Sequence, residues 1–366
     1  MDNRQTLDTL WSQSGIEVAR GHLFEHHPGP SSATASRIEG MMLGLAIGDS
    51  LGNTTEGRRP DDRLRRFGEI RQYTMGRRKK GELGAPSDDT QMAFWTLDQL
   101  NQDKGLVPEH LARRFASSAI FGIGQTVAAF RRNLRAGEHW TQCGPGSAGN
   151  GALMRIAPIL IPHLRTGDTR LWADTALAAM MTHNDAASTA SCLAFVAMLW
   201  ELLEADAPPQ PQWWLERWVS LTRDLECNGR YAPRGGQFMR FEGHLWEFVE
   251  EHVSAAFERQ EPTLKACNSW YSGAYLLETV PCVLYILMQH GHDPQEAIVR
   301  AVNDTKDNDT VAAIVGAAVG ALHGRQALDP AWIEGLTGRT TLNDHGRAFE
   351  ILQEAIDLWL PSPQTP

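Results

Sequence analysis

The sequence predicts an all-α protein. Apolar residues recur at helical spacing in eight segments, and the strict apolar–polar alternation of half-buried strands is nearly absent. Residues 310–322 are rich in Ala and Gly, which let neighbouring helices approach closely, so we expect this helix to lie centrally. The predicted helical segments are residues 91–100, 109–121, 172–181, 187–204, 277–290, 294–302, 310–323 and 346–359.

The composition is that of a globular protein with a large core. The chain has 366 residues, of which 42% are hydrophobic and twelve are Trp. A formal net charge of −10 argues against general nucleic-acid binding. The five Cys are scattered without a CxxC pair, which is typical of buried thiols in a reducing compartment. No secretory signal is visible, and the longest apolar stretch, residues 311–322, is about half of a membrane span. We therefore expect a cytoplasmic protein that binds neither nucleic acid nor membrane.

Residues 1–36 are expected to form an extension that precedes a main domain at residues 37–360. The extension contains a short amphipathic piece around Trp11, followed by a linker-like run rich in Pro and Ser. Ser36 and Glu39 fit a capping box for the first helix of the main domain.

Two regions differ from the rest of the main domain. Residues 58–80 contain ten Arg or Lys against three acids, a local excess of positive charge in an acidic protein. Residues from about 205 to 262 are rich in Pro and Trp, and we interpret them as an inserted helical subdomain.

Two acidic motifs, each at the start of a predicted helix, carry the strongest signal for function. The first, at residues 87–90, reads Ser-Asp-Asp-Thr, and the second, at residues 307–310, reads Asp-Asn-Asp-Thr. Either motif alone is explained by helix capping, but a cap needs only one side-chain acceptor. Four Asp brought together would repel one another unless cations neutralised them, and hard oxygen ligands suit Mg²⁺, Ca²⁺ or Mn²⁺. We therefore predict that the motifs form the two halves of one binuclear metal site.

Glycine-rich segments and nearby polar residues indicate candidate binding surfaces. Residues 44–52 place Gly at four-residue intervals, which suits either tight helix packing or a ligand surface ending in an exposed Asp49. Glu56 lies in a turn-prone stretch and is either a mobile metal ligand or a solvated acid. Residues 144–151 contain four Gly and lead into a predicted helix, so their backbone N–H groups are free to face an anion. We favour a loop that binds phosphate or diphosphate over a plain flexible loop. His183 would orient a ribose hydroxyl or a phosphate, unless it is an ordinary surface histidine.

Taken together and in this order, these pieces resemble the ADP-ribosylglycohydrolase family, of the dinitrogenase-reductase-activating type. The resemblance spans about residues 37–325. It implies an all-α, compact orthogonal helical bundle with two Mg²⁺ ions at the mouth of a cleft, with Mn²⁺ as an alternative ion. The segments that carry it are Gly44–Gly52 with Glu56, the two acidic motifs, residues 144–155, 183–185 and 272–281.

The resemblance also assigns roles to individual residues. One metal would be held by the first acidic motif and the other by the second, with Asp309 as a bridge. Ser87 stands where family members often have Thr, and Lys306 stands where they usually have Gly. Because of Lys306, the resemblance does not predict the backbone conformation of the second motif. The implied metal ligands are Ser87, Asp88, Asp89, Asp307, Asp309 and Thr310, and the implied substrate-binding residues are Asp49, Gly146, Ser147, Gly149, Asn150 and His183.

The expected reaction is removal of mono-ADP-ribose from a modified protein side chain. Two divalent cations would offset the Asp carboxylates and bind the 2″ and 3″ hydroxyls of the distal ribose, which lowers the entropic barrier to attack at its anomeric carbon. Asp89 or Asp309 would assist the attacking water, and Glu56 would act as a mobile ligand or as an acid and base.

The linkage and the partners are expected from the family. Arginine is the expected acceptor side chain, with an N-glycosidic bond, and O-linked or serine-linked ADP-ribose is the runner-up. A non-catalytic ADP-ribose-binding module and a Mg-dependent phosphohydrolase are alternatives from other classes, and the presence of all six candidate ligands favours the hydrolase. Residues 1–36 either contact a partner such as an ADP-ribosyltransferase toxin, as in antitoxin members of the family, or form a disordered tail. Residues 58–80 are either a second partner surface or a solvated loop.

Overall fold

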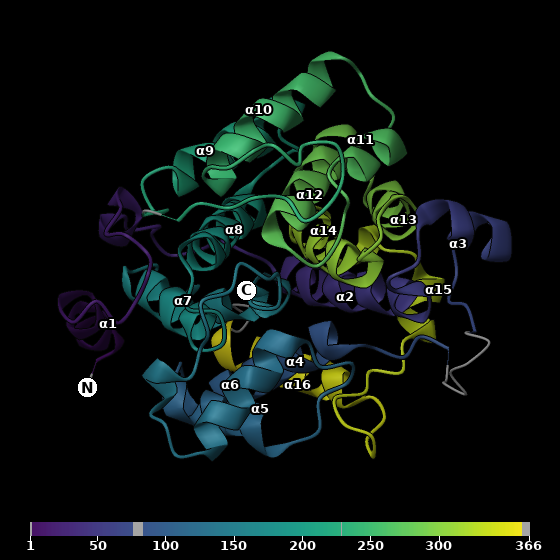
Figure 1. The fold of residues 1–366 in the computed structure, drawn as a ribbon. Coiled ribbons are helices and arrows are strands. Elements are labelled where there is room, and N and C mark those ends of the chain that lie inside the picture. Colours follow the sequence, from purple (N-terminus) through teal and green to yellow (C-terminus); the bar gives the residue numbers. More distant parts are fainter. Residues whose placement is uncertain (1, 76–82, 228, 361–366) are drawn as a thin grey trace.

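Two closely packed helices, α2 (Ala35–Gly52) and α14 (Asn308–His323), lie at the centre of the molecule (Figure 1). Small residues make their contact. A Cβ atom on Gly44 would lie 2.1 Å from the carbonyl oxygen of Gly316, and one on Gly48 would lie 2.0 Å from that of Ala312. The two backbones therefore touch directly. The central position expected for the Ala- and Gly-rich helix is confirmed, and the glycine stripe at residues 44–52 serves tight packing.

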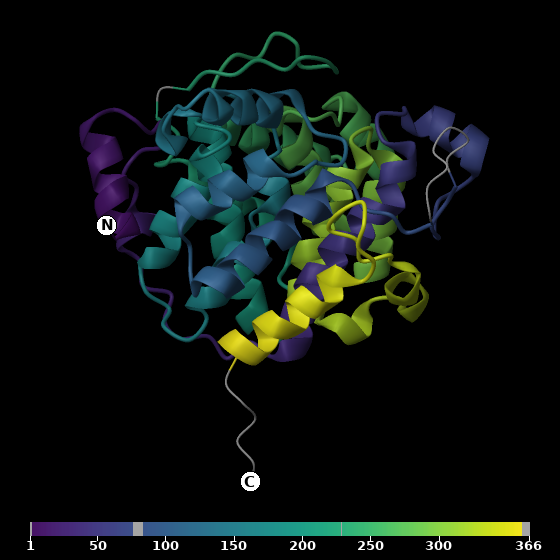
Figure 2. The same ribbon diagram turned by 90° about the horizontal axis from the view of Figure 1, so that it is seen from below.

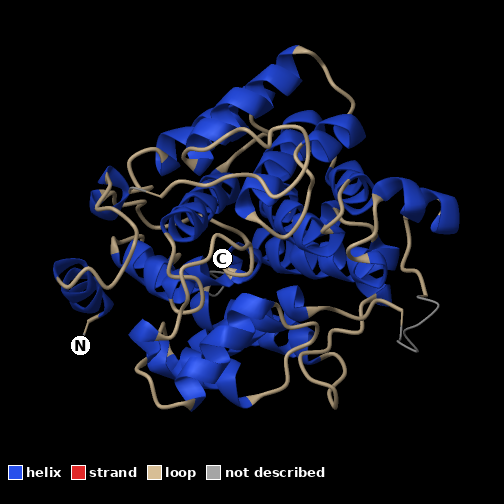
Figure 3. Cartoon of the chain, viewed as in Figure 1, coloured by secondary structure: helices blue, strands red, loops and turns tan. Residues whose placement is uncertain are grey.

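The computed structural model describes residues 2–75, 83–227 and 229–360, and within these ranges the chain forms helices and isolated β-bridges but no sheet. The predicted all-α fold is confirmed (Figure 3). Besides α2 and α14, the α-helices are α1 (Asn3–Ser12), α3 (Pro60–Phe67), α4 (Asp88–Asp103), α5 (Pro108–Ser117), α6 (Gln125–Arg135), α7 (Arg170–Met180), α8 (Ala186–Glu204), α9 (Pro211–Thr222), α10 (Leu245–Glu258), α11 (Thr263–Ser269), α12 (Leu276–His290), α13 (Pro294–Asp304), α15 (Pro330–Gly335) and α16 (Arg347–Trp359). The 3₁₀ helices are His22–Glu25, Asn53–Thr55, Trp140–Gln142, Leu153–Arg155, Ala157–His163 and Arg325–Ala327.

Helices pack on both sides of the central pair. In Figure 1, α4, α5, α6 and α16 lie below it, α9 to α13 lie above it, and α8 lies to its left. α4 contacts both α2 and α14, and α16 packs on α4. On the other side α8, α12 and α13 contact α14. Figure 2 shows α16 running alongside the blue helices of the lower group and the N-terminal segment at the edge of the molecule. Both acidic motifs therefore start helices that meet at the centre.

The eight segments predicted from periodicity all correspond to helices, but α3 and α6 are absent from the prediction, as are the short helices α11 and α15. α3 lies in the basic run and buries Arg63 rather than an apolar stripe, so periodicity does not reveal it. α6 buries only Val127 and Phe130. Hydrophobic spacing cannot identify helices with so small an apolar face.

Acidic residues of the basic run pair with its arginines. Asp62 pairs with Arg58, Arg65 and Arg66, and Glu69 pairs with Arg71, which offsets part of the positive charge of the described residues locally. Residues 76–80 lie outside the described residues.

The Trp-rich region at about residues 205–262 is helical, as interpreted from its composition. It contributes α9 and α10, which pack on α8 and α12 (Figure 1). Trp214 and Trp218 are buried and join the same hydrophobic core as the central helices. The region therefore covers one side of the main body.

The N-terminal residues lie against the main body. α1 packs on α7, and Leu7, Leu10 and Val18 are buried in the common core. The alternative of a disordered tail is therefore wrong for residues 2–36. The capping box expected at Ser36 and Glu39 is also wrong, because α2 begins earlier and its N-cap is the extended residue Thr34.

Helix α8 has the length and composition of a membrane span, alone among the helices of the described part of the chain. However, 94% of its apolar window is buried inside the protein. Helix α8 is thus best explained as a core helix, which its contacts with α7, α9 and α14 support.

Candidate active site

The first acidic motif forms the N-terminus of α4 and is held in place by Asp49. The backbone N–H groups of Ser87 and Thr90 each donate to Asp49 Oδ2 at 3.0 Å, and the Thr90 hydroxyl donates to the same oxygen at 2.5 Å. Asp49 has no exposed surface and does not line the cavity described below. The expectation of an exposed Asp49 is wrong, since the close contact of α2 with α4 and α14 covers it. Its position favours a role in shaping the motif over direct contact with a substrate.

The second acidic motif precedes and starts α14. Asp307 accepts a hydrogen bond from Asn150 Nδ2 at 2.6 Å, and its backbone N–H donates to the Ser272 carbonyl at 2.8 Å. Lys306, the residue that stands in place of the usual Gly, is not among the residues with positive φ. The ammonium group of Lys306 donates a hydrogen bond to Tyr271 Oη at 2.8 Å. The second motif therefore forms without a glycine at this position.

The packing of α2, α4 and α14 brings the two acidic motifs together, although they lie over two hundred residues apart in the sequence. Asp309 lies at the centre, because its carboxylate belongs to two groups of acidic oxygens. Within each group the oxygens lie within 4.8 Å of one another. The first group is Asp49, Asp89 and Asp309, and the second is Glu56, Asp307 and Asp309.

The electrostatics of this cluster favour a bound cation. Burial, followed by repulsion from neighbouring carboxylates, raises the pKa of Asp88, Asp89 and Asp309 well above the usual 3.8. Burial likewise raises the pKa of Asp307 to about 6. Asp89 Oδ1 is buried, and no hydrogen-bond donor among the described residues reaches it. A buried, unpaired carboxylate oxygen beside other carboxylates fits a hard divalent cation such as Mg²⁺.

A buried arginine lies behind the cluster. Arg63 donates to Thr55 Oγ1 at 2.9 Å and to the Thr305 carbonyl at 2.8 Å. It thereby connects the loop that carries Glu56 to the segment that precedes the second motif. Burial lowers the pKa of Arg63 to about 10, so the guanidinium remains charged at neutral pH and partly offsets the acidic cluster. The sequence shows Arg63 only as one member of a basic run and does not predict its buried position.

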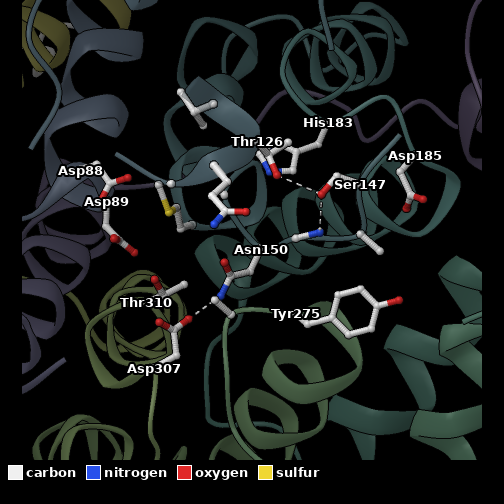
Figure 4. Close-up of a pocket in the computed structure, with 18 of the residues that line it drawn as sticks. Asp88, Asp89, Thr126, Ser147, Asn150, His183, Asp185, Tyr275, Asp307 and Thr310 are labelled. Atoms are coloured by element: carbon white, nitrogen blue, oxygen red, sulfur yellow. Dashed lines mark hydrogen bonds between the residues drawn. The ribbon is translucent and has the colours of Figure 1, made fainter. Parts of the chain in front are cut away.

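A cavity of about 630 Å³ connects the acidic cluster to the glycine-rich loop. In Figure 4 the two acidic motifs lie on one side, Asn150 lies between, and Ser147, His183 and Tyr275 lie on the other side. Ser87 stands behind the cavity wall and donates to Asp89 Oδ2 at 2.8 Å. The predicted residues that line the cavity are Glu56, Asp88, Asp89, Gly146, Ser147, Gly149, Asn150, His183, Asp307, Asp309 and Thr310.

The glycine-rich loop leads into 3₁₀ turns at residues 153–155 and 157–163 rather than into the α-helix expected there. Its anion-binding potential therefore comes from the loop itself and not from a helix terminus. A Cβ atom on Gly151 would lie 2.9 Å from His183 Cε1, so glycine is needed where the backbone passes the imidazole ring. The Ser147 hydroxyl accepts from the Gly149 N–H at 3.3 Å and lies 3.0 Å from Thr126 Oγ1.

His183 is buried in the cavity wall, so the alternative of a surface histidine is wrong. Burial, together with the nearby charge of Arg155, lowers the pKa of His183 to about 3. The ring is therefore neutral at physiological pH. Its Nδ1 lies 2.9 Å from Thr182 Oγ1, and its Nε2 side faces the glycine-rich loop.

Several residues at the end of the cavity away from the acidic cluster were missed as site residues. Asp185 lies in the segment 183–185 that carries the resemblance but has no predicted role, and Thr126 follows Gly122 and Gly124, for which no function is predicted. Tyr231 and Arg234 come from the Trp-rich region, where the pair Gly235 and Gly236 is the only signal in the sequence. Their place in the wall depends on how that region packs, which local sequence does not reveal.

Comparison with known proteins identifies the family. The sequence model of the ADP-ribosylglycohydrolase family matches residues 30–359. The chain belongs to the ADP-ribosylglycohydrolase family. It is 26% identical over 313 residues to the ADP-ribosyl-[dinitrogen reductase] glycohydrolase of Rhodospirillum rubrum, covering 84% of this chain and 92% of that protein. It is also 26% identical over 330 residues to the ADP-ribosylarginine hydrolase Tri1 of Serratia proteamaculans, covering 86% of this chain and 79% of that protein.

The fold agrees with this family. A solved structure described as an ADP-ribosylglycohydrolase-related protein complex superposes with a TM-score of 0.64 at 24% identity, covering 89% of this chain and 97% of that chain. Membership of the ADP-ribosylglycohydrolase family makes the protein a hydrolase that acts on ADP-ribosylated substrates. The resemblance inferred from the motifs is therefore confirmed.

The raised carboxyl pKa values predict a metal-dependent response of stability to pH. Because the folded protein holds these protons more tightly than the unfolded chain, the carboxyl contribution to stability is complete below pH 3.8. For Asp307 it disappears as the pH rises through about 6. In EDTA we expect the free energy of unfolding to fall by an amount on the order of 1–3 kcal/mol between pH 3.8 and about 6. In Mg²⁺ we expect most of this decrease to disappear.

Urea unfolding at several pH values, in EDTA and in Mg²⁺, measures this difference. Glu226 provides an internal reference, because its pKa, raised by burial to about 8, affects both series equally. Parallel pH curves in EDTA and in Mg²⁺ would contradict a cation at the acidic cluster.

Proposed function

We propose that this protein is a Mg²⁺-dependent ADP-ribosylarginine hydrolase that removes mono-ADP-ribose from modified protein side chains. The observation that carries the proposal is the single cavity that joins the acidic cluster to the glycine-rich loop. Eight segments between residues 56 and 310 meet there, in an arrangement suited to a ribose diol at one end and a diphosphate along the wall.

Of the six residues implied as metal ligands, the five that line the cavity would hold two divalent cations, and Ser87 would orient the carboxylate of Asp89. When bound, such ions would offset the carboxylate charge and hold the vicinal hydroxyls of the distal ribose. Ser147, Gly149 and His183 would hold the diphosphate and the adjacent ribose. A neutral His183 suits this role, because its imidazole can donate or accept a hydrogen bond without carrying charge.

The acidic side chains would also handle the protons of hydrolysis. Asp89 or Asp309 would take a proton from water as its oxygen forms a bond to C1″ of the ribose. The C1″–N bond breaks, and its electron pair leaves with the guanidine group, which is then protonated. Glu56 is exposed at the cavity and is placed to act as a mobile acid or ligand.

The choice of arginine rests on the relative named an ADP-ribosylarginine hydrolase, with which this chain shares 26% identity. Serine-linked ADP-ribose is the competing substrate. The direct test is release of ADP-ribose from ADP-ribosyl-arginine and ADP-ribosyl-serine peptides in Mg²⁺, in EDTA, and in EDTA followed by excess Mg²⁺.

We expect release from the arginine peptide that stops in EDTA and returns with Mg²⁺. Release from the serine peptide alone would overturn the proposed linkage. Tight binding of ADP-ribose without any release would instead support the non-catalytic binding module.

A further inference from the structure

The N-terminal segment at residues 13–21, here called the arm, lies before the part of the chain that matches the family. It contacts the Trp-rich region along a short extended stretch. The Ala19 N–H donates to the Leu225 carbonyl at 2.9 Å, and Val18 forms an isolated β-bridge with Glu226. The thiol of Cys227 donates to the Glu17 carbonyl at 2.8 Å. These contacts attach the arm to the segment that leads towards Tyr231.

The arm also contacts the loop that carries His183, through the side chain of Asn184. Asn184 Nδ2 donates to the Gly15 carbonyl at 3.0 Å, and Asn184 Oδ1 accepts from the Glu17 N–H at 3.3 Å. The backbone N–H of Asn184 donates to the Pro145 carbonyl in the glycine-rich loop at 3.0 Å. Asn184 therefore lies where the arm, the His183 loop and the glycine-rich loop meet.

The residues on either side of Asn184 belong to the cavity wall. His183 and Asp185 both line the cavity, and Figure 4 shows them together at its end away from the acidic cluster. The Tyr231 hydroxyl donates to Asp185 Oδ1 at 3.1 Å and accepts from the Ala187 N–H at 3.1 Å. The arm thus contacts both parts of the chain that build this end of the cavity.

We infer that the arm positions the end of the cavity away from the acidic cluster, and that Asn184 is the positioning residue through which it acts. The inference rests on the proposed function only in naming ADP-ribose, whose nucleotide half would occupy that end. If the arm is detached, the His183 loop samples more conformations, and a ligand must order the loop when it binds. The acidic cluster is carried by α2, α4 and α14, so its affinity for cations is independent of the arm.

The test compares Asn184→Ala with Asn3→Ala in the full-length protein. Asn3 is a matched control, because its side-chain amide also makes two hydrogen bonds that attach the N-terminal residues, at 2.9 Å to Leu106 O and 2.6 Å to Asp174 Oδ1. We expect Asn184→Ala to weaken calorimetric binding of both ADP-ribose and ADP about tenfold, since two hydrogen bonds are lost. Turnover at saturating substrate and affinity for Mn²⁺ should change less than twofold. In Asn3→Ala all four quantities should stay within about twofold of the wild type, even if its melting temperature falls.

Equal ADP-ribose affinity in Asn184→Ala and the wild type would overturn the inference, as would an equal loss in both variants. If the wild-type protein binds no ADP-ribose, the proposed function fails separately. The arm is then tested by amide hydrogen exchange of residues 182–188. Faster exchange in Asn184→Ala than in Asn3→Ala supports the inference, and unchanged exchange refutes it.

Discussion

Asp309→Asn is expected to abolish Mg²⁺-dependent hydrolysis while making the metal-free protein more stable. The carboxylate of Asp309 belongs to both groups of acidic oxygens, so its loss weakens each half of the proposed metal site. We expect turnover to fall by roughly 10³-fold or more. The amide is nearly isosteric, and its oxygen can still accept the hydrogen bond that Asp309 Oδ1 receives from the Thr310 N–H at 3.0 Å.

The gain in stability follows from the electrostatics of the metal-free cluster. Burial and the charges of Asp89 and Asp307 raise the pKa of Asp309, so an ionised carboxylate at this position opposes folding. A neutral amide removes this repulsion, and we expect the free energy of unfolding in EDTA to rise by about 1 kcal/mol or more at neutral pH.

Paired measurements separate these effects. Unfolding in EDTA and in Mg²⁺, together with hydrolysis of ADP-ribosyl-arginine, should be compared for Asp309→Asn and for Asp206→Asn, a change at an exposed loop carboxylate. The control should behave as the wild type. Full activity of Asp309→Asn would remove Asp309 from the proposed site, and a less stable metal-free protein would contradict the proposed repulsion.

The predicted site residues that the structure brings together are those whose chemistry is visible in a short motif. Paired carboxylates and a hydroxyl at a helix start are unusual for a cap, and both acidic motifs do reach the cavity. Asp49 is different, because its burial depends on how α2 meets α4 and α14. The burial of Arg63 could not be predicted either, because only the tertiary structure distinguishes this arginine from the solvated arginines around it.

Helices with a strong apolar periodicity were predicted from the sequence, and helices held mainly by polar contacts or by few apolar residues were missed. Helices α8 and α12 carry long apolar runs, whereas α3 is anchored by the hydrogen bonds of Arg63. The wall formed by Tyr231 and Arg234 was missed for a third reason. A connection between α9 and α10 carries these residues, and their position depends on contacts with α8 and the N-terminal residues.

Gly48→Ala is expected to destabilise the protein strongly, opposite to the usual effect of this substitution. Within a helix, replacing Gly with Ala normally stabilises by about 0.5–1 kcal/mol, because the unfolded chain loses conformational freedom. Here the added Cβ would lie 2.0 Å from the carbonyl oxygen of Ala312 and 2.3 Å from its carbonyl carbon. Both are backbone atoms of a buried helix, so α2 and α14 must separate. We expect a loss of about 3 kcal/mol or more.

The same separation should act on the acidic cluster, because Asp49 follows Gly48 on α2 and Asp309 lies near the start of α14. Affinity for Mn²⁺ should therefore fall together with stability. Gly124→Ala serves as the control for stability, since Gly124 has negative φ and its Cβ would meet no heavy atom within 4 Å. Chemical unfolding and Mn²⁺ titration of both variants test the relation. If Gly48→Ala stabilised the protein, the direct backbone contact between α2 and α14 would be refuted. If it lost stability but kept full Mn²⁺ affinity, the carboxylates would be held by α4 and the Glu56 loop rather than by the spacing of the central helices.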